Sequence, residues 1–261
     1  MKIVLIGAGN VATHLGGALK KAGYELIQLY SRTEESALCL ARQLEIPYTT
    51  DVAHVRCDAD MYLVAIKDAA LTSFIPLLVQ GREQAFFVHT AGSMPMDVWK
   101  GYAVRYGVLY PMQTFSKQQA VDFTTVPFFV EANHTTDLNA LKMIGTRLGS
   151  NFYEATSQQR QFLHLAAVFA CNFSNHMYAL SAQILKQQGI PFEVMLPLID
   201  ETAKKVHSLD PVDAQTGPAV RNDENVMQKQ LDLLRTEPVL QRIYEEISKS
   251  IYQLKNQNNK I

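Results

Sequence analysis

The first residues of the chain constrain its fold more than any other segment. A continuous apolar run, Lys2–Ile6, leads directly into Gly7-Ala8-Gly9-Asn10-Val11-Ala12, and an amphipathic segment extends from Asn10 to Ala22. In a βαβ unit the first glycine of this motif allows a tight turn, and the second lets the backbone approach a pyrophosphate. Ala12 replaces the third glycine and still permits close packing of helix on strand. The flanking strand and helix make the motif informative, so the sequence predicts a dinucleotide-binding Rossmann unit.

Strand-like and helix-like segments alternate through the first half of the chain. The predicted strands are Lys2–Ile6, Glu25–Tyr30, Asp60–Ile66 and Ala85–Val88, extended by Val104–Leu109, Phe128–Glu131 and Asn151–Glu154. The predicted helices are Asn10–Ala22, Glu34–Leu44 and Ala69–Val79. This alternation favours right-handed crossovers and a doubly wound α/β sheet.

The strand pattern stops after about residue 155. Thr156 and Gln159 match a capping box, which opens an apolar-periodic helix predicted to end at Gln188. Further helices are predicted at Phe192–Ser208, Asn225–Arg235 and Pro238–Lys255, with a loop at Asp210–Asn222. The chain is therefore expected to form a Rossmann domain over residues 1–154 and an all-α domain over residues 155–261.

Composition limits the classes of partner. The hydrophobic fraction is 48%, and the formal net charge is −1, with acidic and basic residues scattered. A basic stripe marks nucleic-acid binding, so no nucleic-acid partner is expected. No apolar stretch approaches the roughly 18–20 residues of a membrane span, and the first apolar run ends at Gly7. Cys39, Cys57 and Cys171 have no metal-ligand spacing, so we expect reduced thiols, a cytoplasmic protein and no metal site.

The end of the second predicted strand favours NADP over NAD. An NAD-specific site places Asp or Glu there to bind the ribose hydroxyls. This chain has Ser31-Arg32-Thr33, whose hydroxyls and guanidinium suit a 2′-phosphate, although Arg32 is alternatively a solvated loop residue. The free N–H groups of Asn10 and Val11, at the positive end of a helix dipole, are expected to bind the pyrophosphate.

Two further turns are expected to line the nicotinamide half of the site. Ligands of doubly wound sheets bind at the carboxyl ends of the strands. The candidate residues are Ala65, Ile66 and Lys67 after one strand, and Thr90, Ala91 and Gly92 after the next. The small side chains leave room for a ring. Lys67 and the neighbouring Asp68 are equally well explained as solvated loop charges.

Several segments together resemble a known family. They are Gly7–Ala12, His89–Ser93, Tyr110–Phe115, His164–Phe173 and Thr216–Asp223. With them the chain resembles Rossmann-like NADP oxidoreductases of the coenzyme F420-dependent type that carry a C-terminal DUF2520 domain, similar to the C-terminal domain of 6-phosphogluconate dehydrogenase. More distantly it is similar to pyrroline carboxylate reductases and prephenate dehydrogenases. The resemblance implies hydride transfer at the domain interface and a homodimer formed through the helical domain.

The sequence departs from the family pattern at two places. Tyr110 stands where a histidine is expected, and a phenol titrates near pH 10 rather than near pH 6.5. Val220 and Asn222 replace the small residues expected in the later loop, which is therefore expected to be less flexible.

The long predicted helix carries the leading candidate for a proton donor, His164. Four residues of this helix are expected to share one face, because offsets of 4, 7 and 11 fall close together at about 100° per residue: His164, Val168, Cys171 and Asn175. In the related helical-domain dehydrogenases a Lys, His or Asn of this helix meets the substrate. Asn172 is accordingly expected to hold a carbonyl or carboxylate. Both side chains are alternatively buried polar groups with purely structural hydrogen bonds.

Tyr110, Gln113, Thr114 and Arg221 complete the candidate catalytic set. Arg221 would clamp a carboxylate with two hydrogen bonds, or else fix a loop to a partner subunit. Asp223 is predicted to cap the following helix. 

Two functions remain open from the sequence. The first is an NADP-dependent oxidoreductase acting on a small polar carbonyl, imine or hydroxy substrate. The second is a non-catalytic NADP-binding sensor or scaffold. A deazaflavin such as F420 as a second cofactor is a further alternative.

Overall fold

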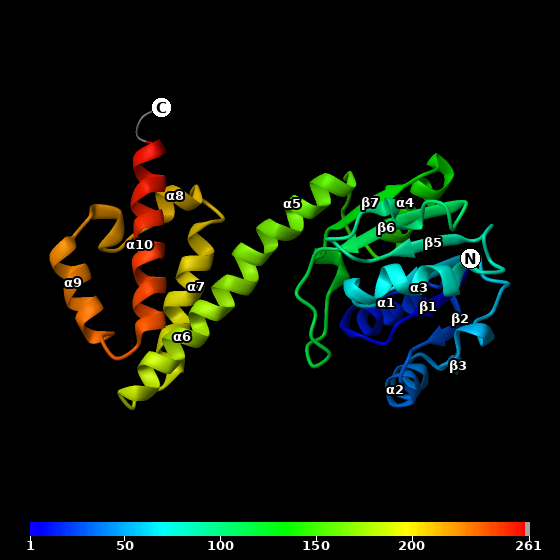
Figure 1. The fold of residues 1–261 in the computed structure, drawn as a ribbon, viewed down its shortest axis with the longest axis horizontal. Helices are drawn as coiled ribbons and strands as arrows, with labels where there is room; N and C mark the ends of the chain where they lie inside the picture. The colour runs from blue at the N-terminus through cyan, green and yellow to red at the C-terminus, as the bar shows by residue number, and fades with distance from the viewer. Residues whose placement is uncertain (259–261) are drawn as a thin grey trace. The chain divides into compact units, whose positions relative to one another are not determined.

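The computed structural model describes residues 1–258, which divide into two compact units, residues 1–172 and the residues from 173 onward. The first unit contains an eight-stranded sheet with the order β3-β2-β1-β4-β5-β6-β7-β8 (Figure 1). The strands are β1 (Lys2–Ile6), β2 (Glu25–Tyr30), β3 (Tyr48–Thr49), β4 (Met61–Val64), β5 (Phe86–His89), β6 (Arg105–Pro111), β7 (Phe128–Ala132) and β8 (Phe152–Glu154). Neighbouring strands are parallel except for β6 and β7.

This strand order confirms the predicted doubly wound fold. The first six strands follow the dinucleotide-binding order. Strands β1 to β3 are added toward one edge of the sheet and β4 to β6 toward the other, so the strand order reverses between β1 and β4. The residues of β1 from Ile3 to Ile6 are fully buried, as expected for a parallel strand covered on both faces. The predicted strand Asp60–Ile66 is longer than β4 at both ends. Asp60 precedes the strand, and Ala65 and Ile66 already form the turn that follows it.

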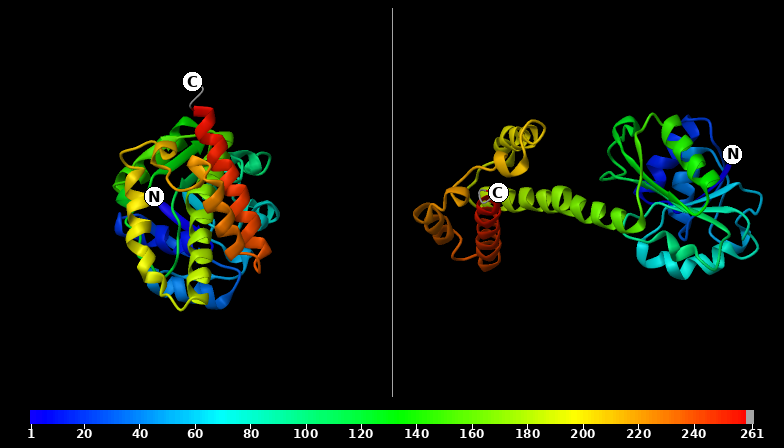
Figure 2. Two further views of the ribbon diagram at one scale, coloured as in Figure 1. Left: turned by 90° about the vertical axis from the view of Figure 1, so that its left-hand side faces the viewer. Right: turned by 90° about the horizontal axis from the view of Figure 1, so that it is seen from above.

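Helices cover both faces of the sheet (Figure 2). On one face lie α1 (Asn10–Lys21), α2 (Glu34–Leu44) and α4 (Thr135–Arg147), and on the other lies α3 (Asp68–Val79). Short 3₁₀ turns lie at η1 (Val52–His54), η2 (Met96–Trp99) and η3 (Phe123–Thr125). The two apolar layers hold the strands rigidly, so the turns at the strand ends have fixed positions.

The helix α4 has no counterpart in the sequence prediction. Its segment begins with two threonines and carries Gly145 near its end, which is a weak helix pattern. Leu141 and Ile144 are fully buried in the core. A Cβ added at Gly145 would lie 3.2 Å from the ring of Phe152 in β8, so the glycine allows close packing. Tertiary packing therefore determines this helix more than local propensity does.

The second unit is helical, as predicted. Its elements are α6 (Ser174–Gln187), η5 (Phe192–Met195), α7 (Leu196–Lys205), α8 (Pro211–Ala214), η6 (Ala219–Arg221), α9 (Glu224–Leu233) and α10 (Pro238–Asn258). The predicted loop Asp210–Asn222 thus contains two short helical turns. Asp223 accepts a hydrogen bond from the backbone N–H of Val226 at 3.2 Å, which confirms the predicted cap of α9.

The predicted long helix is present but irregular. It begins at α5 (Ser157–Ala167) with the predicted capping box of Thr156 and Gln159, and it continues into α6 through a π-helical segment, η4 (Val168–Phe173). A π-helix bonds i to i+5, so the regular spacing that placed His164 and Asn175 on one face is wrong across this segment. Secondary structure changes near the predicted domain boundary at residue 155, whereas the first compact unit extends to Asn172.

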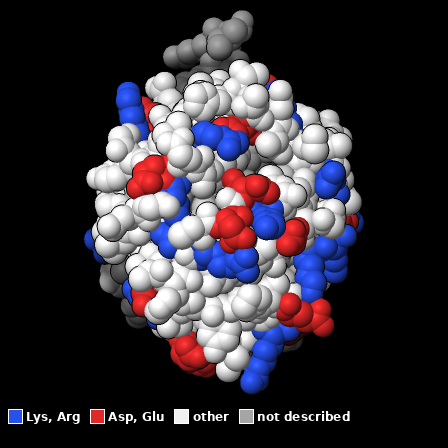
Figure 3. Space-filling view, turned by 90° about the vertical axis from the view of Figure 1, so that its right-hand side faces the viewer, with Lys and Arg blue, Asp and Glu red and all other residues white. Residues whose placement is uncertain are grey.

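Charged side chains of both signs intermix on one face of the first unit (Figure 3). Within residues 1–258, no helix is both long enough and apolar enough to span a membrane.

Candidate active site

The turns that carry most of the predicted site residues lie along one edge of the sheet. The strands β1, β4, β5 and β6 are parallel, so their carboxyl ends meet at this edge. Backbone hydrogen bonds join the turns: the Gly7 N–H donates to the Tyr30 carbonyl at 2.7 Å, and the Thr90 N–H donates to the Val64 carbonyl at 3.1 Å. This is the edge at which such sheets bind ligands.

The two glycines of the first turn differ in why a glycine stands at each position. Gly7 has φ +109°, and a Cβ there would lie 2.3 Å from the carbonyl oxygen of Ala65. Gly9 is the N-cap of α1 with φ −80°, and apart from Gly9 and its two chain neighbours no atom of the described protein lies within 4 Å of an added Cβ. The fold therefore requires the first glycine, whereas the second keeps open space beside the helix terminus.

The N-terminus of α1 fits a pyrophosphate. Gly9 has no side chain to cap the helix, and the first N–H groups of any helix have no partner within it. The predicted contacts, the backbone N–H groups of Asn10 and Val11, lie in this first turn. The Asn10 side chain donates to the Phe115 carbonyl at 2.7 Å, so it anchors the segment after β6.

Ser31, Arg32 and Thr33 follow β2 at the same edge. Ser31 is buried, Arg32 is exposed, and Thr33 precedes α2 without a side-chain cap bond. The nearby carboxylate of Glu34 accepts a hydrogen bond from the Tyr48 hydroxyl at 2.5 Å. The side chain of Glu34 is therefore held by Tyr48, and Arg32 is the cationic residue that directly follows this strand.

His89 supports the turn after β5. Its Nδ1 accepts a hydrogen bond from the Ala91 N–H at 3.2 Å, so the ring hydrogen is on Nε2, which donates to the Pro95 carbonyl at 3.4 Å. Burial, together with the positive charge of Arg160, lowers the pKa of His89 to about 3. The imidazole is therefore neutral at physiological pH, and its two nitrogens hold the backbone at Ala91 and Pro95.

Tyr110 and His164 form a hydrogen-bonded pair beside this turn. The Tyr110 hydroxyl lies 3.2 Å from Nδ1 of His164. A Cβ added at Gly92 would lie 2.6 Å from the Tyr110 ring, so the glycine lets the phenol pack directly against the turn. Burial raises the pKa of Tyr110, while the positive charge of Arg160 opposes the shift. At neutral pH the phenol therefore carries its proton.

The turn after β4 joins the turn after β5. The Ser93 hydroxyl donates a hydrogen bond to the carboxylate of Asp68, which lies in the first turn of α3. Asp68 is exposed, but its carboxylate therefore also links the start of α3 to the turn after β5. Lys67 is exposed at the N-cap position of α3, and Ala65 is buried against β1.

Within the described part of the first unit, neither Gln113 nor Asn172 makes a hydrogen bond to Tyr110 or His164. Gln113 is exposed, and its side-chain oxygen accepts only locally, from the Thr114 N–H at 2.8 Å. Asn172 is exposed in the π-helical segment. Arg221 is exposed in the second unit. Their catalytic roles remain predictions.

Sequence reasoning missed Arg160 and Glu131, which form an ion pair in which the arginine is fully buried and the carboxylate is 19% exposed. One signal was present in the sequence. Arg160 lies four residues before His164 in an otherwise uncharged segment, and residues so spaced share a helix face.

Two family models match the chain. One, described as NADP oxidoreductase coenzyme F420-dependent, matches residues 2–91. The other, the domain of unknown function DUF2520, matches residues 126–251. The prediction of NADP as cofactor agrees with the description of the first family.

Solved structures are similar over nearly the whole chain. A Bacteroides fragilis protein assigned as an NADP oxidoreductase is 56% identical, with a TM-score of 0.92 over 97% of this chain and 98% of that one. An imine reductase from Myxococcus stipitatus, in complex with NADP⁺, is 16% identical, with a TM-score of 0.69 over 100% and 94% of the two chains. A 1-pyrroline-5-carboxylate reductase from Streptococcus pyogenes is 15% identical, with a TM-score of 0.65 over 97% and 98%.

The two reductases share the fold, and none of the curated proteins compared matches the chain. Both halves of the predicted resemblance are confirmed by the family models, and the B. fragilis protein matches from end to end. The chain belongs to the NADP oxidoreductase family of the coenzyme F420-dependent type and carries a DUF2520 domain.

Proposed function

We propose that the protein is an NADP-dependent reductase in which Tyr110 and His164 supply the proton that accompanies hydride transfer. The observation that carries this proposal is the 3.2 Å contact between the Tyr110 hydroxyl and Nδ1 of His164, beside Gly92 at the ligand-binding edge of the sheet. Reduction of a C=N or C=O bond needs a hydride and a proton, and a positioned side chain commonly delivers the proton.

The pair keeps one transferable hydrogen in either tautomer of the imidazole. If the Tyr110 hydroxyl donates to Nδ1, a neutral His164 carries its hydrogen on Nε2. If Nδ1–H donates to the phenol oxygen, the hydroxyl hydrogen of Tyr110 is free to bond elsewhere. A proton taken from one end is replaced through the hydrogen bond between them. The tyrosine that departs from the family pattern thus becomes one half of a donor pair.

The chain's own residues fit the cofactor along the sheet edge. Gly9 and the first turn of α1 would hold the pyrophosphate, and Arg32 would bind the 2′-phosphate. The turn from Thr90 to Gly92 would face the nicotinamide, which supplies the hydride when it is bound. His89 keeps this turn fixed, and the buried position of Tyr110 limits access of water to its hydroxyl.

The proposed substrate is a small polar molecule with an imine, carbonyl or hydroxyl group. Two proteins with the same fold are an imine reductase and a pyrroline carboxylate reductase, and both names denote reduction of a C=N bond. A cyclic imine is therefore the first substrate class to test, with keto acids and hydroxy acids next.

Turnover of such a panel tests the proposal. We expect NADPH absorbance at 340 nm to fall with at least one imine or keto acid, or NADP⁺ to be reduced by a hydroxy acid. Wild-type protein that binds NADPH yet turns over no member of a broad panel would favour the alternative, a non-catalytic sensor or scaffold.

We propose in addition that the helical unit is covered by a second copy of the chain. Among its described hydrophobic residues only Ala219 and Leu240 are buried, whereas Leu233 is 82% exposed. A groove of about 470 Å³ lies between α6 and α10, lined mainly by Met177, Leu180, Ile184, Leu240, Ile243 and Ile247. Contiguous apolar surface of this kind marks an interaction site.

Sedimentation measurements test the dimer with a matched pair of variants. We expect wild-type protein to sediment with twice the mass of one chain. Ile184→Glu would place an unpaired carboxylate in the groove and should raise the dimer dissociation constant by at least about 100-fold. Leu77→Glu is the control, because Leu77 is similarly exposed but lies in α3 of the first unit. A monomeric wild type at micromolar concentration would contradict the proposal.

A further inference from the structure

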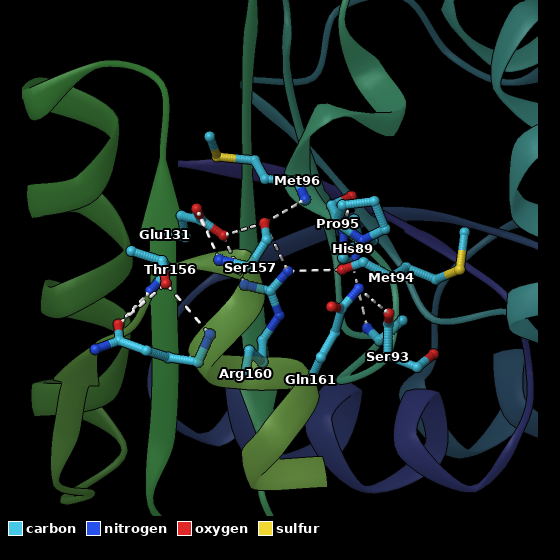
Figure 4. Close-up of polar contacts among 12 residues, drawn as sticks. His89, Ser93, Met94, Pro95, Met96, Glu131, Thr156, Ser157, Arg160 and Gln161 are labelled. Atoms are coloured by element: carbon cyan, nitrogen blue, oxygen red, sulfur yellow. Dashed lines mark hydrogen bonds and ion pairs between the residues drawn. The ribbon is translucent and has the colours of Figure 1, made fainter. Parts of the chain in front are cut away.

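A buried arginine lies behind the proposed proton-donor pair. The side chain of Arg160, in the first turns of α5, has no exposed surface. Its two terminal nitrogens each donate at 2.6 Å, one to the carboxylate of Glu131 in β7 and the other to the carbonyl of Met94 (Figure 4). One guanidinium therefore joins three segments: the helix, the neighbouring strand and the turn that follows β5.

Other side chains of the same helix turn hold the same loop. The Ser157 hydroxyl accepts from the Met96 N–H at 2.8 Å, and Gln161 donates to the Ser93 carbonyl at 3.1 Å. Glu131 in turn accepts from the Ser157 N–H at 3.1 Å and from the Ser157 hydroxyl at 2.8 Å. The segment Ser93–Met96 is thus fastened at three points to one turn of α5.

The same helix also carries the proposed proton donor. His164 lies four residues after Arg160, so the two side chains share a face of α5. His164 bonds to Tyr110, and the ring of Tyr110 packs on Gly92, one residue before the fastened segment. The helix therefore sets the distance between the turn after β5 and the Tyr110–His164 pair.

Stability alone is a weak explanation for this ion pair. Replacing a buried ion pair with well-packed apolar side chains is often neutral or stabilising. Moreover, Nε of Arg160 is buried without a hydrogen-bond partner among the described residues, which adds a cost. One of the two contacts at 2.6 Å that the guanidinium does make is directed at the backbone of the turn after β5, at the Met94 carbonyl.

We infer that Arg160 is a positioning residue, which holds the Ser93–Met96 turn against the Tyr110–His164 pair and directs a positive charge toward Tyr110. The inference rests on the proposed function, because it assigns that turn and that pair to the reacting end of the site. The groups that act on the phenol are His164 and Arg160 from α5, Asp68 from α3 and Cys171 from η4. Arg160 is the one cation among them that is permanently charged.

Two measurements that need no substrate test the inference. Amide hydrogen exchange reports how firmly the turn is held at Met96. The Cζ resonance of Tyr110 in ¹³C-tyrosine-labelled protein, assigned by comparison with Tyr110→Phe, reports ionisation and hydrogen bonding of the phenol. In Arg160→Met we expect exchange at Met96 to be about tenfold faster, which corresponds to loss of one charge-assisted hydrogen bond. The pKa of Tyr110 should rise, because the charge that favours its phenolate is gone.

Two further variants separate positioning from a general loss of stability. Arg160→Lys keeps the charge but cannot bridge Met94 and Glu131, so exchange should accelerate while the titration of Tyr110 stays near wild type. Arg82→Lys is the matched control, because Arg82 is also buried and bonds backbone carbonyls in the same unit, at 2.5 Å to Val55. It should lower the melting temperature without changing either readout.

Wild-type exchange at Met96 together with a wild-type Tyr110 titration in Arg160→Met would overturn the inference. If that variant does not fold, Arg160→Lys decides: faster exchange at Met96 supports the inference, and unchanged exchange overturns it. If both readouts move as expected while the wild type reduces no substrate, the proposed function fails and the positioning role stands.

Discussion

Replacing His164 with alanine is expected to lower kcat by about 10²- to 10⁴-fold, the usual contribution of a positioned general acid or base. The side chain is half-buried, and its Nδ1 contacts the Tyr110 hydroxyl, so its removal leaves the phenol without its proton partner. Affinity for NADPH should stay within about threefold of wild type, because the phosphate-binding turns are formed by other residues. Single-turnover NADPH oxidation, measured with the best substrate of the panel, is the assay.

A double-mutant cycle distinguishes a pair from two independent residues. Tyr110→Phe removes only the hydroxyl and should also lower kcat. If the two groups pass on one proton, the double variant should be little worse than His164→Ala alone, since effects of groups that act as a unit are not additive. His134→Ala is the control, because His134 is exposed at the start of α4 and makes no cap hydrogen bond. Full activity in His164→Ala would refute the assignment.

Replacing Gly9 with alanine is expected to reduce NADPH affinity by about 100-fold while the fold is maintained. The φ of Gly9 suits any residue, and its added Cβ meets no atom of the described protein. The free energy of unfolding should therefore change by less than about 1 kcal/mol. The Cβ would instead occupy space that the pyrophosphate needs. The resulting loss of NADPH binding free energy is on the scale of one or two charge-assisted hydrogen bonds. Isothermal titration calorimetry and denaturant unfolding measure the two effects.

Two other glycines of the same segment serve as controls for Gly9→Ala. Gly17 also has open space and lies inside α1, so Gly17→Ala should stabilise the protein by about 0.5–1 kcal/mol and leave NADPH binding unchanged. Gly7→Ala should destabilise the fold itself, because its Cβ would lie 2.3 Å from a backbone oxygen at a positive φ. Gly9→Ala protein that binds NADPH like wild type would show that the open space is not part of the site.

The predicted cofactor half of the site rests on local signals in the sequence. The segment from Lys2 to Ala12 encodes strand, turn and helix in consecutive residues, and the positive φ of Gly7 belongs to that turn. The prediction of a 2′-phosphate site at Ser31-Arg32-Thr33 is local in the same way, since this segment directly follows a strand that the apolar pattern defines.

The other half depends on contacts between distant segments. Arg160 meets Met94 across 66 residues, and Tyr110 meets His164 across 54, so neither contact has a local signature. The sequence also does not predict the π-helical segment from Val168 to Phe173. Over so few residues, the apolar pattern of a π-helix is the same as that of a regular α-helix. Helix α4 was missed because buried packing, rather than propensity, determines it.

The most direct test of the account is a comparison of NADPH and NADH affinities in wild type and in Arg32→Ala. The account predicts tighter binding of NADPH than of NADH by the wild type. In the variant, NADPH affinity should fall by about 10- to 100-fold, the scale of a charge-assisted contact to phosphate, while NADH affinity changes little. Equal affinities in the wild type, or an equal loss for both nucleotides in the variant, would contradict a 2′-phosphate site at Arg32.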